Sequence, residues 1–453
     1  MNRSLGRLRL AFGVAIVTTI FASEASAQSR PLQTLTLGDA ARLAARQSAV
    51  AQGAALRVEQ AEARADQRRS ELFPNLSALA SGSQRSFNTA TLGLEFPTPP
   101  GQPPVFDPEG EVIGGVHTYD LRGRLSQTLF DASVLGRWRA AQFNARAVGI
   151  EATAAGEASA NAAASAYVRV LRAEAQLSAR SADSALAEEL LGIARDVLTA
   201  GVGVALDVTR AESQRSVVRA QLIAARNERD RAELELHRAL GIPLDAPLAT
   251  ADSLGRVDAP APVDEAAALA RAFDRRPDLR ALEAQLDAAE QQVRAIRLER
   301  LPAVGLVADQ GITGRTVDHM LATYSFGVQL SVPIFDGFRR EARIDEQRAV
   351  EREIEVRRRD LREQVAIEVR GALLDLASAR EQVDAARERL RFAEQELAQS
   401  RERFRAGVAG NADVITASLA LTGARTQLND ALASFQVARV ALARATGSVT
   451  ELP

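Results

Sequence analysis

The stretch Leu330-Ser331-Val332-Pro333-Ile334-Phe335-Asp336 decides the fold, because a near copy of it, Leu125-Ser126-Gln127-Thr128-Leu129-Phe130-Asp131, lies 205 positions earlier. Tyr119 corresponds to Tyr324 at the same offset. Further along, Ala239-Leu240-Gly241 corresponds to Ala445-Thr446-Gly447 at an offset of 206. An offset this steady over more than a hundred residues indicates that the chain consists of two tandem copies of one unit.

The N-terminus has the pattern of an export signal. Arg3, Arg7 and Arg9 precede a short apolar stretch, and small residues follow at Ala25-Ser26-Ala27, before a predicted cleavage ahead of Gln28. The apolar stretch is shorter than the roughly 20 residues that a spanning helix needs. We therefore expect an exported protein without a transmembrane helix. The predicted segments are a signal peptide (1–27), a first repeat (28–242), a Pro/Asp/Ala-rich linker (243–262), a second repeat (263–447) and a short tail (448–453).

Each copy contains a predicted β-hairpin. From Tyr324 to Ile334 apolar residues alternate with small or polar ones, and the same alternation runs through residues 119–129. A period of two is typical of a strand with one apolar and one polar face. The predicted partner strands cover about 75–86 and 303–313. The first hairpin has a long Pro/Gly-rich loop at 97–108, and the second is expected to turn near residues 311–315.

Helical patterns surround these strands. Each copy begins with one, at residues 37–71 and 263–300, and a long proline-free stretch such as 131–198 spans about 100 Å as a helix. Large residues recur every seven positions in the second copy, with a small residue three positions later in most cases. The large positions are Val369, Leu376, Val383, Leu390, Leu397 and Phe404, and then Val414, Leu421, Leu428, Phe435 and Leu442. Such heptads predict closely packed helices with a left-handed supercoil.

Four strands of this length suit a membrane but cannot close a barrel alone, and open sheet edges are not tolerated in lipid. A closed barrel must therefore include strands from other copies of the same chain. Eight strands from a dimer and twelve from a trimer would both close, and the residues do not decide between them.

In their order and spacing, these features resemble the TolC-type outer-membrane efflux proteins over nearly the whole mature chain. The resemblance rests on the duplication, the two hairpins, the strand end at Ser331 to Gly337, the segment Arg276-Pro277-Asp278-Leu279 and the Gly-x5-Asp-Val helix reversals. The resemblance implies an α+β membrane protein that forms a homotrimer. Four strands per chain contribute to one outer-membrane β-barrel, which a long periplasmic α-helical coiled-coil barrel continues. It also implies a passive exit duct that works with a periplasmic adaptor and an inner-membrane pump.

The resemblance suggests site residues too. Asp207 and Asp413 correspond to acids that narrow the periplasmic mouth in known members, and Thr416 stands where a second acid is sometimes present. Both aspartates could instead be plain helix N-caps. The helix reversals, a candidate adaptor-docking tip, contain Gly201, Gly203, Gly407 and Gly410. Arg122, Arg124 and Gln329 lie on the polar strand face, which would line the barrel lumen, either as selectivity residues or as ordinary solvated groups.

Composition narrows the remaining function classes. The formal net charge is −2 and cysteine is absent, which argues against nucleic-acid binding and excludes disulfides, thiolate sites and a lipidated cysteine. His117, His237 and His319 are scattered, so we expect no metal site, no cofactor and no enzyme activity. The main alternative is a periplasmic coiled-coil adaptor or structural protein with no barrel. The exported substrate and the identity of the pump are left open.

Overall fold

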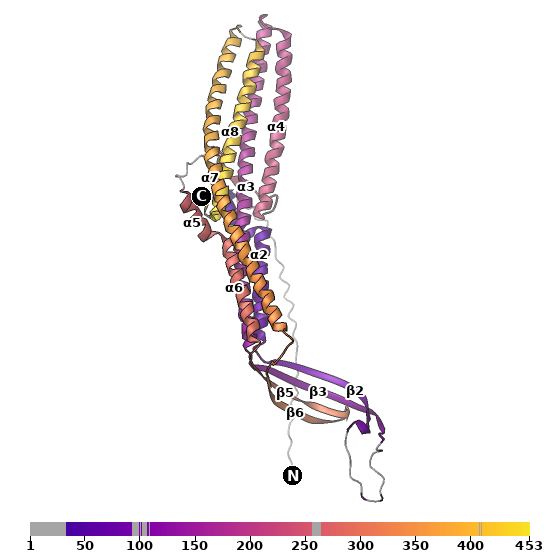
Figure 1. The fold of residues 1–453 in the computed structure, drawn as a ribbon. Helices are drawn as coiled ribbons and strands as arrows, with labels where there is room; N and C mark the ends of the chain where they lie inside the picture. Colours follow the sequence, from indigo (N-terminus) through magenta and orange to yellow (C-terminus); the bar gives the residue numbers. More distant parts are fainter. Residues whose placement is uncertain are drawn as a thin grey trace, which may run out of the picture.

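The computed structural model describes residues 33–92, 99, 101, 107, 109–255, 264–406, 408 and 410–453. Figure 1 shows a long column of helices with a β-sheet at one end and two helical hairpin turns at the other. The elements of the first half are β1 (Gln33–Leu35), α1 (Leu37–Gln47), α2 (Ala49–Ser70), β2 (Asn75–Asn88), β3 (Val112–Phe130), α3 (Ala132–Thr199) and α4 (Ala205–Leu240). The strand β4 (Leu248–Thr250) follows. The second half contains α5 (Glu265–Arg275), α6 (Pro277–Leu298), β5 (Ala303–Thr316), β6 (His319–Ser331), α7 (Arg339–Arg405) and α8 (Asn411–Ala445).

The two predicted hairpins form one antiparallel sheet in the order β2-β3-β5-β6. Its apolar face is exposed in the single chain: Tyr324, Phe326 and Val328 on β6 are 61–85% exposed. Within the described part of the chain, the outer edges of β2 and β6 bond to no further strand. Among the described residues of the single chain, therefore, neither edge strand has a neighbour on its outer side, and no other element covers the apolar face.

The predicted position of the second turn is wrong. Residues 311–315 lie inside β5, and the chain reverses at Val317 and Asp318, where Thr316 pairs with His319. Gly311 instead allows β3 to approach, because a Cβ atom there would lie 2.3 Å from the Leu121 carbonyl oxygen. Most of the predicted loop at 97–108 lies outside the described residues.

Each predicted N-terminal helix is divided in two. Ser48 has an extended backbone and caps α2 by accepting a hydrogen bond from the Ala51 N–H group. In the second half Pro277 occupies the first turn of α6, and the residue before a proline disfavours helical geometry. The breaks thus fall where a cap and a proline stop continuous hydrogen bonding.

The predicted heptad seam of α7 and α8 is buried. Val369, Val383, Val414 and Phe435 have no exposed surface, and Leu397 and Phe404 are 5% exposed. In the first copy the heptad positions are less completely buried at the end of α3, where Leu198 is 37% exposed. The small residues between these positions let α8 pack closely against α7, whose part nearer the sheet packs against α6.

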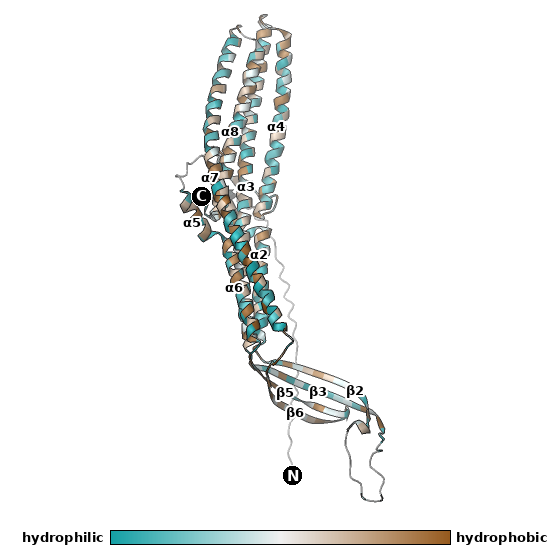
Figure 2. Ribbon diagram, in the orientation of Figure 1, coloured by the Kyte–Doolittle hydropathy of each residue, from teal (hydrophilic) through white to brown (hydrophobic). Residues whose placement is uncertain are grey.

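Two helices, α3 and α7, run through the whole column (Figure 1). Near the sheet α3 packs against α2 and α6, and toward the other end against α4 and α8. Among the described residues no helix is long and apolar enough to cross a membrane. Figure 2 accordingly shows hydrophilic and hydrophobic residues mixed along every helix of the column.

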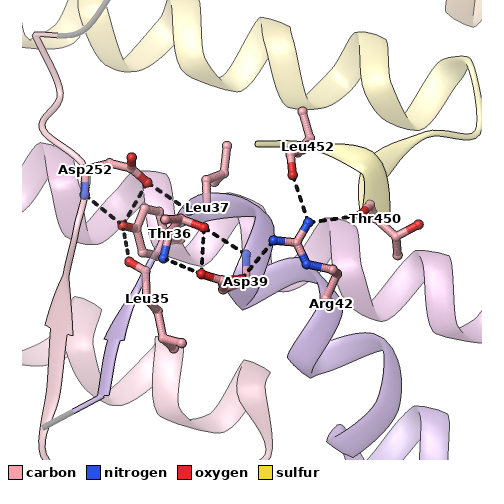
Figure 3. A network of polar contacts seen from close by, with 9 residues as sticks. Leu35, Thr36, Leu37, Asp39, Arg42, Asp252, Thr450 and Leu452 are labelled. Atoms are coloured by element: carbon pink, nitrogen blue, oxygen red, sulfur yellow. Dashed lines mark hydrogen bonds and ion pairs between the residues drawn. The ribbon is translucent and has the colours of Figure 1, made fainter.

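A polar network joins the first repeat to the linker midway along the column. The buried Tyr167 hydroxyl on α3 lies 2.8 Å from the Leu35 carbonyl oxygen and 3.0 Å from an Asp252 carboxylate oxygen. Asp252 also accepts a hydrogen bond from the Leu37 N–H group at 2.8 Å (Figure 3). Burial raises the pKa of Tyr167 above its usual value, so the hydroxyl stays protonated. The predicted linker is therefore structured at β4, which pairs in parallel with β1, whereas residues 256–263 lie outside the described part.

The last residues of the chain close the same network. Arg42 on α1 donates to the carbonyl oxygens of Thr450 and Leu452 (Figure 3), and the Gly38 N–H group donates to Pro453 at 2.9 Å. A side chain at position 38 would collide with this segment, because its Cβ would lie 2.0 Å from the Leu452 carbonyl oxygen. The segment 448–453 is thus part of the packed structure.

A second network surrounds Arg276, whose side chain is 6% exposed. The guanidinium donates to both carboxylate oxygens of Asp278 and to Glu368 on α7. Burial raises the pKa of Asp278, but the hydrogen bonds from Arg276 outweigh burial and hold it below its usual value. Arg276 therefore ties the start of α6 to α7.

We expect Arg276→Met to lower the free energy of unfolding by about 1–2 kcal/mol, because it leaves two partly solvated carboxylates without their cation. The lowered pKa of Asp278 contributes stability above about pH 4 and loses it as pH falls through the folded-state value. The deficit of the variant should therefore be largest at neutral pH and shrink in acid. The apparent melting temperature measured against pH checks this, with the exposed Arg280→Met as control. A deficit that is equal at all pH values would contradict the ion-pair account.

The α7–α8 seam gives a packing prediction. Ala424 is fully buried against α7, so Ala424→Leu should overpack the seam and cost roughly 1–3 kcal/mol. The control is Ala398→Leu, at an exposed position of α7. Circular-dichroism melting of both variants is the measurement; equal melting of the parent and Ala424→Leu would show that the seam lies elsewhere.

Candidate functional site

The polar face of the sheet gathers charged groups from two strands. Arg122 on β3 pairs with Asp120 and, at 2.8 Å, with Asp309 on β5. Ser325 on β6 donates a hydrogen bond to the same Asp309 carboxylate. The Asp309 side chain is only 11% exposed, so the three strands share a partly enclosed ionic cluster. Asp120 and Asp309 balance the charges of Arg122 and the neighbouring Arg124.

The other two lumen candidates lie on this face as well. Arg124 stands directly opposite Asp309 in the strand register, and Gln329 lies four residues beyond Ser325 on β6. Both are exposed. The structure therefore brings Arg122 and Arg124 together and leaves Gln329 nearer the helical column.

At the opposite end of the column, α3 reverses into α4 through two glycines. Gly201 has a positive φ of 74°, which a residue with a side chain adopts at a cost. The Gly203 N–H group donates to the Val197 carbonyl oxygen at 3.0 Å, and a Cβ on Gly203 would lie 3.0 Å from Leu198 N. The first reversal therefore depends on both glycines.

The second reversal differs. Gly410 has an ordinary extended backbone before α8 and open space around it, so its conformation does not require glycine. Gly407 lies outside the described residues. Exposed valines flank both turns, since Val202 and Val408 are 77% and 70% exposed. The tip of the column thus presents apolar side chains to solvent.

The N-cap interpretation of the two aspartates is wrong. The caps are Val204 and Gly410, and Asp207 and Asp413 occupy the third helical position, in the first turn of α4 and of α8. Their charges still stabilise the positive end of each helix dipole. Asp207 is half-buried and lies 3.8 Å from Arg210, whereas Asp413 is exposed. The Thr416 hydroxyl donates back to the Ala412 carbonyl oxygen of its own helix.

Asn411 is a site residue that sequence reasoning missed. It is fully buried, and its side-chain amide donates to the Asp207 carbonyl oxygen at 2.9 Å. This bond joins the starts of α4 and α8, which places Asp207 and Asp413 at the same end of the column. Among the described residues the Asn411 side-chain oxygen has no hydrogen-bond partner. Asn411 corresponds to Ala205 in the first copy. This difference between a polar and an apolar residue at equivalent positions was the signal in the sequence that pointed to Asn411.

Among the described residues no three His, Asp or Glu side chains cluster in a way that would hold a metal ion. The candidate residues instead divide between a charged strand face at one end of the molecule and a pair of acids at the other.

Comparison with known proteins identifies the family. The profile of the family described as "Outer membrane efflux protein" matches residues 40–242 and 268–448, which is most of the chain. The chain belongs to this outer-membrane efflux family. Family membership places the protein in the outer membrane, with a large periplasmic helical part, and the family is one of channel proteins rather than enzymes.

Individual relatives are more distant. The chain is 30% identical over 177 residues to the alkaline protease secretion protein AprF of Pseudomonas aeruginosa, which is 38% of this chain and 37% of AprF. It is 28% identical over 293 residues to the outer membrane efflux protein BepC of Brucella suis, which is 64% of this chain and 63% of BepC. The matched parts are therefore less than two thirds of the length of either relative.

Solved structures agree with the fold. A membrane protein from Pseudomonas aeruginosa is similar with a TM-score of 0.74 at 22% identity, over 91% of this chain and 92% of that one. The CmeC outer membrane channel of Campylobacter jejuni is similar with a TM-score of 0.72 at 18% identity, over 91% of this chain and 85% of CmeC. The predicted fold class, a sheet for an outer-membrane barrel continued by a periplasmic helical column, is confirmed.

Proposed function

We propose that this family member is the outer-membrane exit duct of a tripartite efflux or type I secretion system. In this proposal it passively conducts solutes from a periplasmic adaptor and an inner-membrane pump to the outside. The observation that carries the proposal is the four-stranded sheet, with an exposed apolar face and two open edges, at the end of a helical column about 100 Å long. A periplasmic adaptor without a barrel would have no use for such a sheet.

We propose a homotrimer, in which twelve strands close the barrel and the apolar sheet face contacts outer-membrane lipid. The open edge of β6 in one copy would pair with β2 of the next. Exposed apolar residues on the outer helices support the same arrangement. Those on one face of α7 are Val356, Ile367, Leu374 and Phe392, and those on α4 are Leu206, Val217, Ile223 and Leu234. Two different surfaces that meet head to tail generate a closed ring.

The other assignments are parts of the same proposal. The tip around Gly201, Gly203, Gly407 and Gly410 would dock the adaptor, which its exposed valines support. Arg122, Arg124 and Gln329 would line the barrel lumen. The division into a signal peptide, two repeats, a linker and a tail is supported by the two separately matched ranges. The substrate is left open, since the names of the relatives refer both to protease secretion and to efflux.

The gate would form where the column ends. Threefold repetition of Asp207 and Asp413 would place six carboxylates around one narrow opening, which attracts cations at a range of about 8–10 Å. Asn411 would hold the two helical hairpins of each chain together there. Because Thr416 stands where a second acid could follow Asp413, the ring should be weaker than one built from three acids per chain.

Native mass spectrometry in detergent tests the assembly, and the expected species is a trimer. Leu374→Arg places a charge on the α7 stripe, where Leu374 is 71% exposed, and should shift the protein toward monomers. Ala398→Arg, at an exposed α7 position away from that stripe, should remain trimeric. A parent protein that is a stable monomer or dimer would contradict the proposal.

Planar-bilayer conductance tests the duct and its gate. The parent should form cation-selective channels that divalent or trivalent cations block from the side of the tip. Asp207→Asn/Asp413→Asn should lose part of that selectivity and block, because the ring charge is gone, whereas the distant, exposed Asp384→Asn should not. Unchanged selectivity and block in the double variant would leave both aspartates with the helix-dipole role alone.

A further inference from the structure

A hollow of about 820 Å³ lies among α2, α3, α6 and α7, at the end of the column next to the sheet. Its charged lining residues are Arg64, Arg68, Glu71, Arg137, Glu353 and Arg357. We propose that this hollow is an anion-binding site for phosphate or carboxylate groups of the solutes that the duct conducts. The inference rests on the proposed function, because a passing solute reaches this hollow only if the column encloses a duct.

The excess of positive charge is confined to this hollow. Four arginines against two glutamates leave an excess of two positive charges in each hollow, although the whole chain carries −2. Further along α7 the excess is absent. One hollow is lined by Glu368, Asp375 and Arg444, and another by Arg169, Arg172, Asp375 and Asp430. The excess is therefore a property of the section beside the sheet.

The arginines are only partly neutralised within the described part of the chain, and Arg357 is the one that has a glutamate, Glu353, to itself. Glu71 is shared between Arg68 at 2.9 Å and Arg137 at 3.2 Å. Arg64, one helical turn before Arg68 on the same face of α2, has no ion pair or hydrogen bond among the described residues. Like charges one turn apart destabilise a helix. An anion between Arg64 and Arg68 would remove that repulsion.

The chemistry favours oxyanions with several charges. A guanidinium group donates two parallel hydrogen bonds to a phosphate or carboxylate group. The side chains of Arg68 and Arg137 are 54% and 31% exposed, so water and salt weaken each contact. Only a ligand that meets several arginines together overcomes this competition. Amide donors on α2 and α6 also line the hollow, among them Gln67 and Gln292.

The position of the hollow fits a duct. The helices pack in the order α2, α3, α6, α7, so a hollow bordered by all four lies on the concave side of this arc. On α7 its lining residues Gln347 and Ile354 continue at seven-residue spacing to Glu368 and Asp375, which line the next hollows. A solute that moves along this face therefore passes from sections without excess positive charge into the arginine-rich one.

Isothermal titration calorimetry at low salt tests the site, with inorganic tripolyphosphate as probe and the full chain in detergent. Arg64→Gln should weaken binding about tenfold, and Arg64→Gln/Arg68→Gln further, because each loses a charge-assisted contact. The matched control is Arg69→Gln/Arg359→Gln, which removes two exposed arginines outside the hollow. It should bind like the parent. Equal affinity in the parent and the Arg64/Arg68 variant, or no binding by the parent, would overturn the proposal.

Measurements of single-channel current test whether the anion site lies inside the duct. Tripolyphosphate should reduce the current of the parent and affect the Arg64→Gln/Arg68→Gln variant much less. Binding that leaves the current of a conducting parent unchanged would overturn the placement in the duct. A parent that binds tripolyphosphate but conducts no current at all would contradict the proposed function and not the anion site, so the two failures are distinguishable.

Discussion

A backbone N–H or C=O group without a hydrogen-bond partner costs several kcal/mol in hydrocarbon, and the proposed assembly of this protein follows from that cost. The sheet of a single chain has two edge strands, β2 of 14 residues and β6 of 13 residues, whose outer groups bond to no further strand in the described part of the chain. Placing this sheet in a membrane is favourable only when the edges of neighbouring chains pair. In the proposed trimer the barrel is therefore formed by assembly rather than by folding of one chain.

The helical column connects that barrel to the tip and is longer than a bilayer is thick. Two helices, α3 and α7, run through it without interruption for 68 and 67 residues, while shorter helices pack against them in succession. Alanine at alternate seam positions keeps the helices close, and a strict seven-residue repeat sustains the supercoil. The Tyr167–Asp252 network and the Arg42 contacts fix the chain where one set of packing helices ends and the next begins.

Local patterns were predictable from the sequence because they repeat. The alternation from Tyr324 onward and the heptads of α7 and α8 each follow from one periodic signal, and the equivalent positions of Asp207 and Asp413 follow from the duplication. The second turn was misplaced because Gly311 resembles a turn residue, whereas its lack of a side chain serves the contact with β3. The caps were misassigned because a cap depends on the backbone of a single residue, Val204 or Gly410.

Long-range contacts left no periodic signal. Tyr167 and Asp252 are 85 residues apart, and Arg42 meets Leu452 across 410 residues. Asn411 is similar, because its role depends on a carbonyl group of another helical hairpin, at Asp207. The cluster of Arg122 and Asp309 needs the register between β3 and β5, which the sequence of either strand alone does not specify.

Disulfide cross-linking between sheet edges tests the central claim most directly, because the chain contains no cysteine of its own. Pairs of cysteines would be placed at polar-face positions of the two edges, such as Ser77 or Ser81 on β2 and Ser325 or Ser331 on β6. Oxidation in the outer membrane should give covalent species up to trimers on a denaturing gel. Ser83→Cys/Thr118→Cys, which pair within one chain, is the control and should remain monomeric. Only monomers from every edge pair, while the control pair forms its bond, would contradict closure of the sheet between chains.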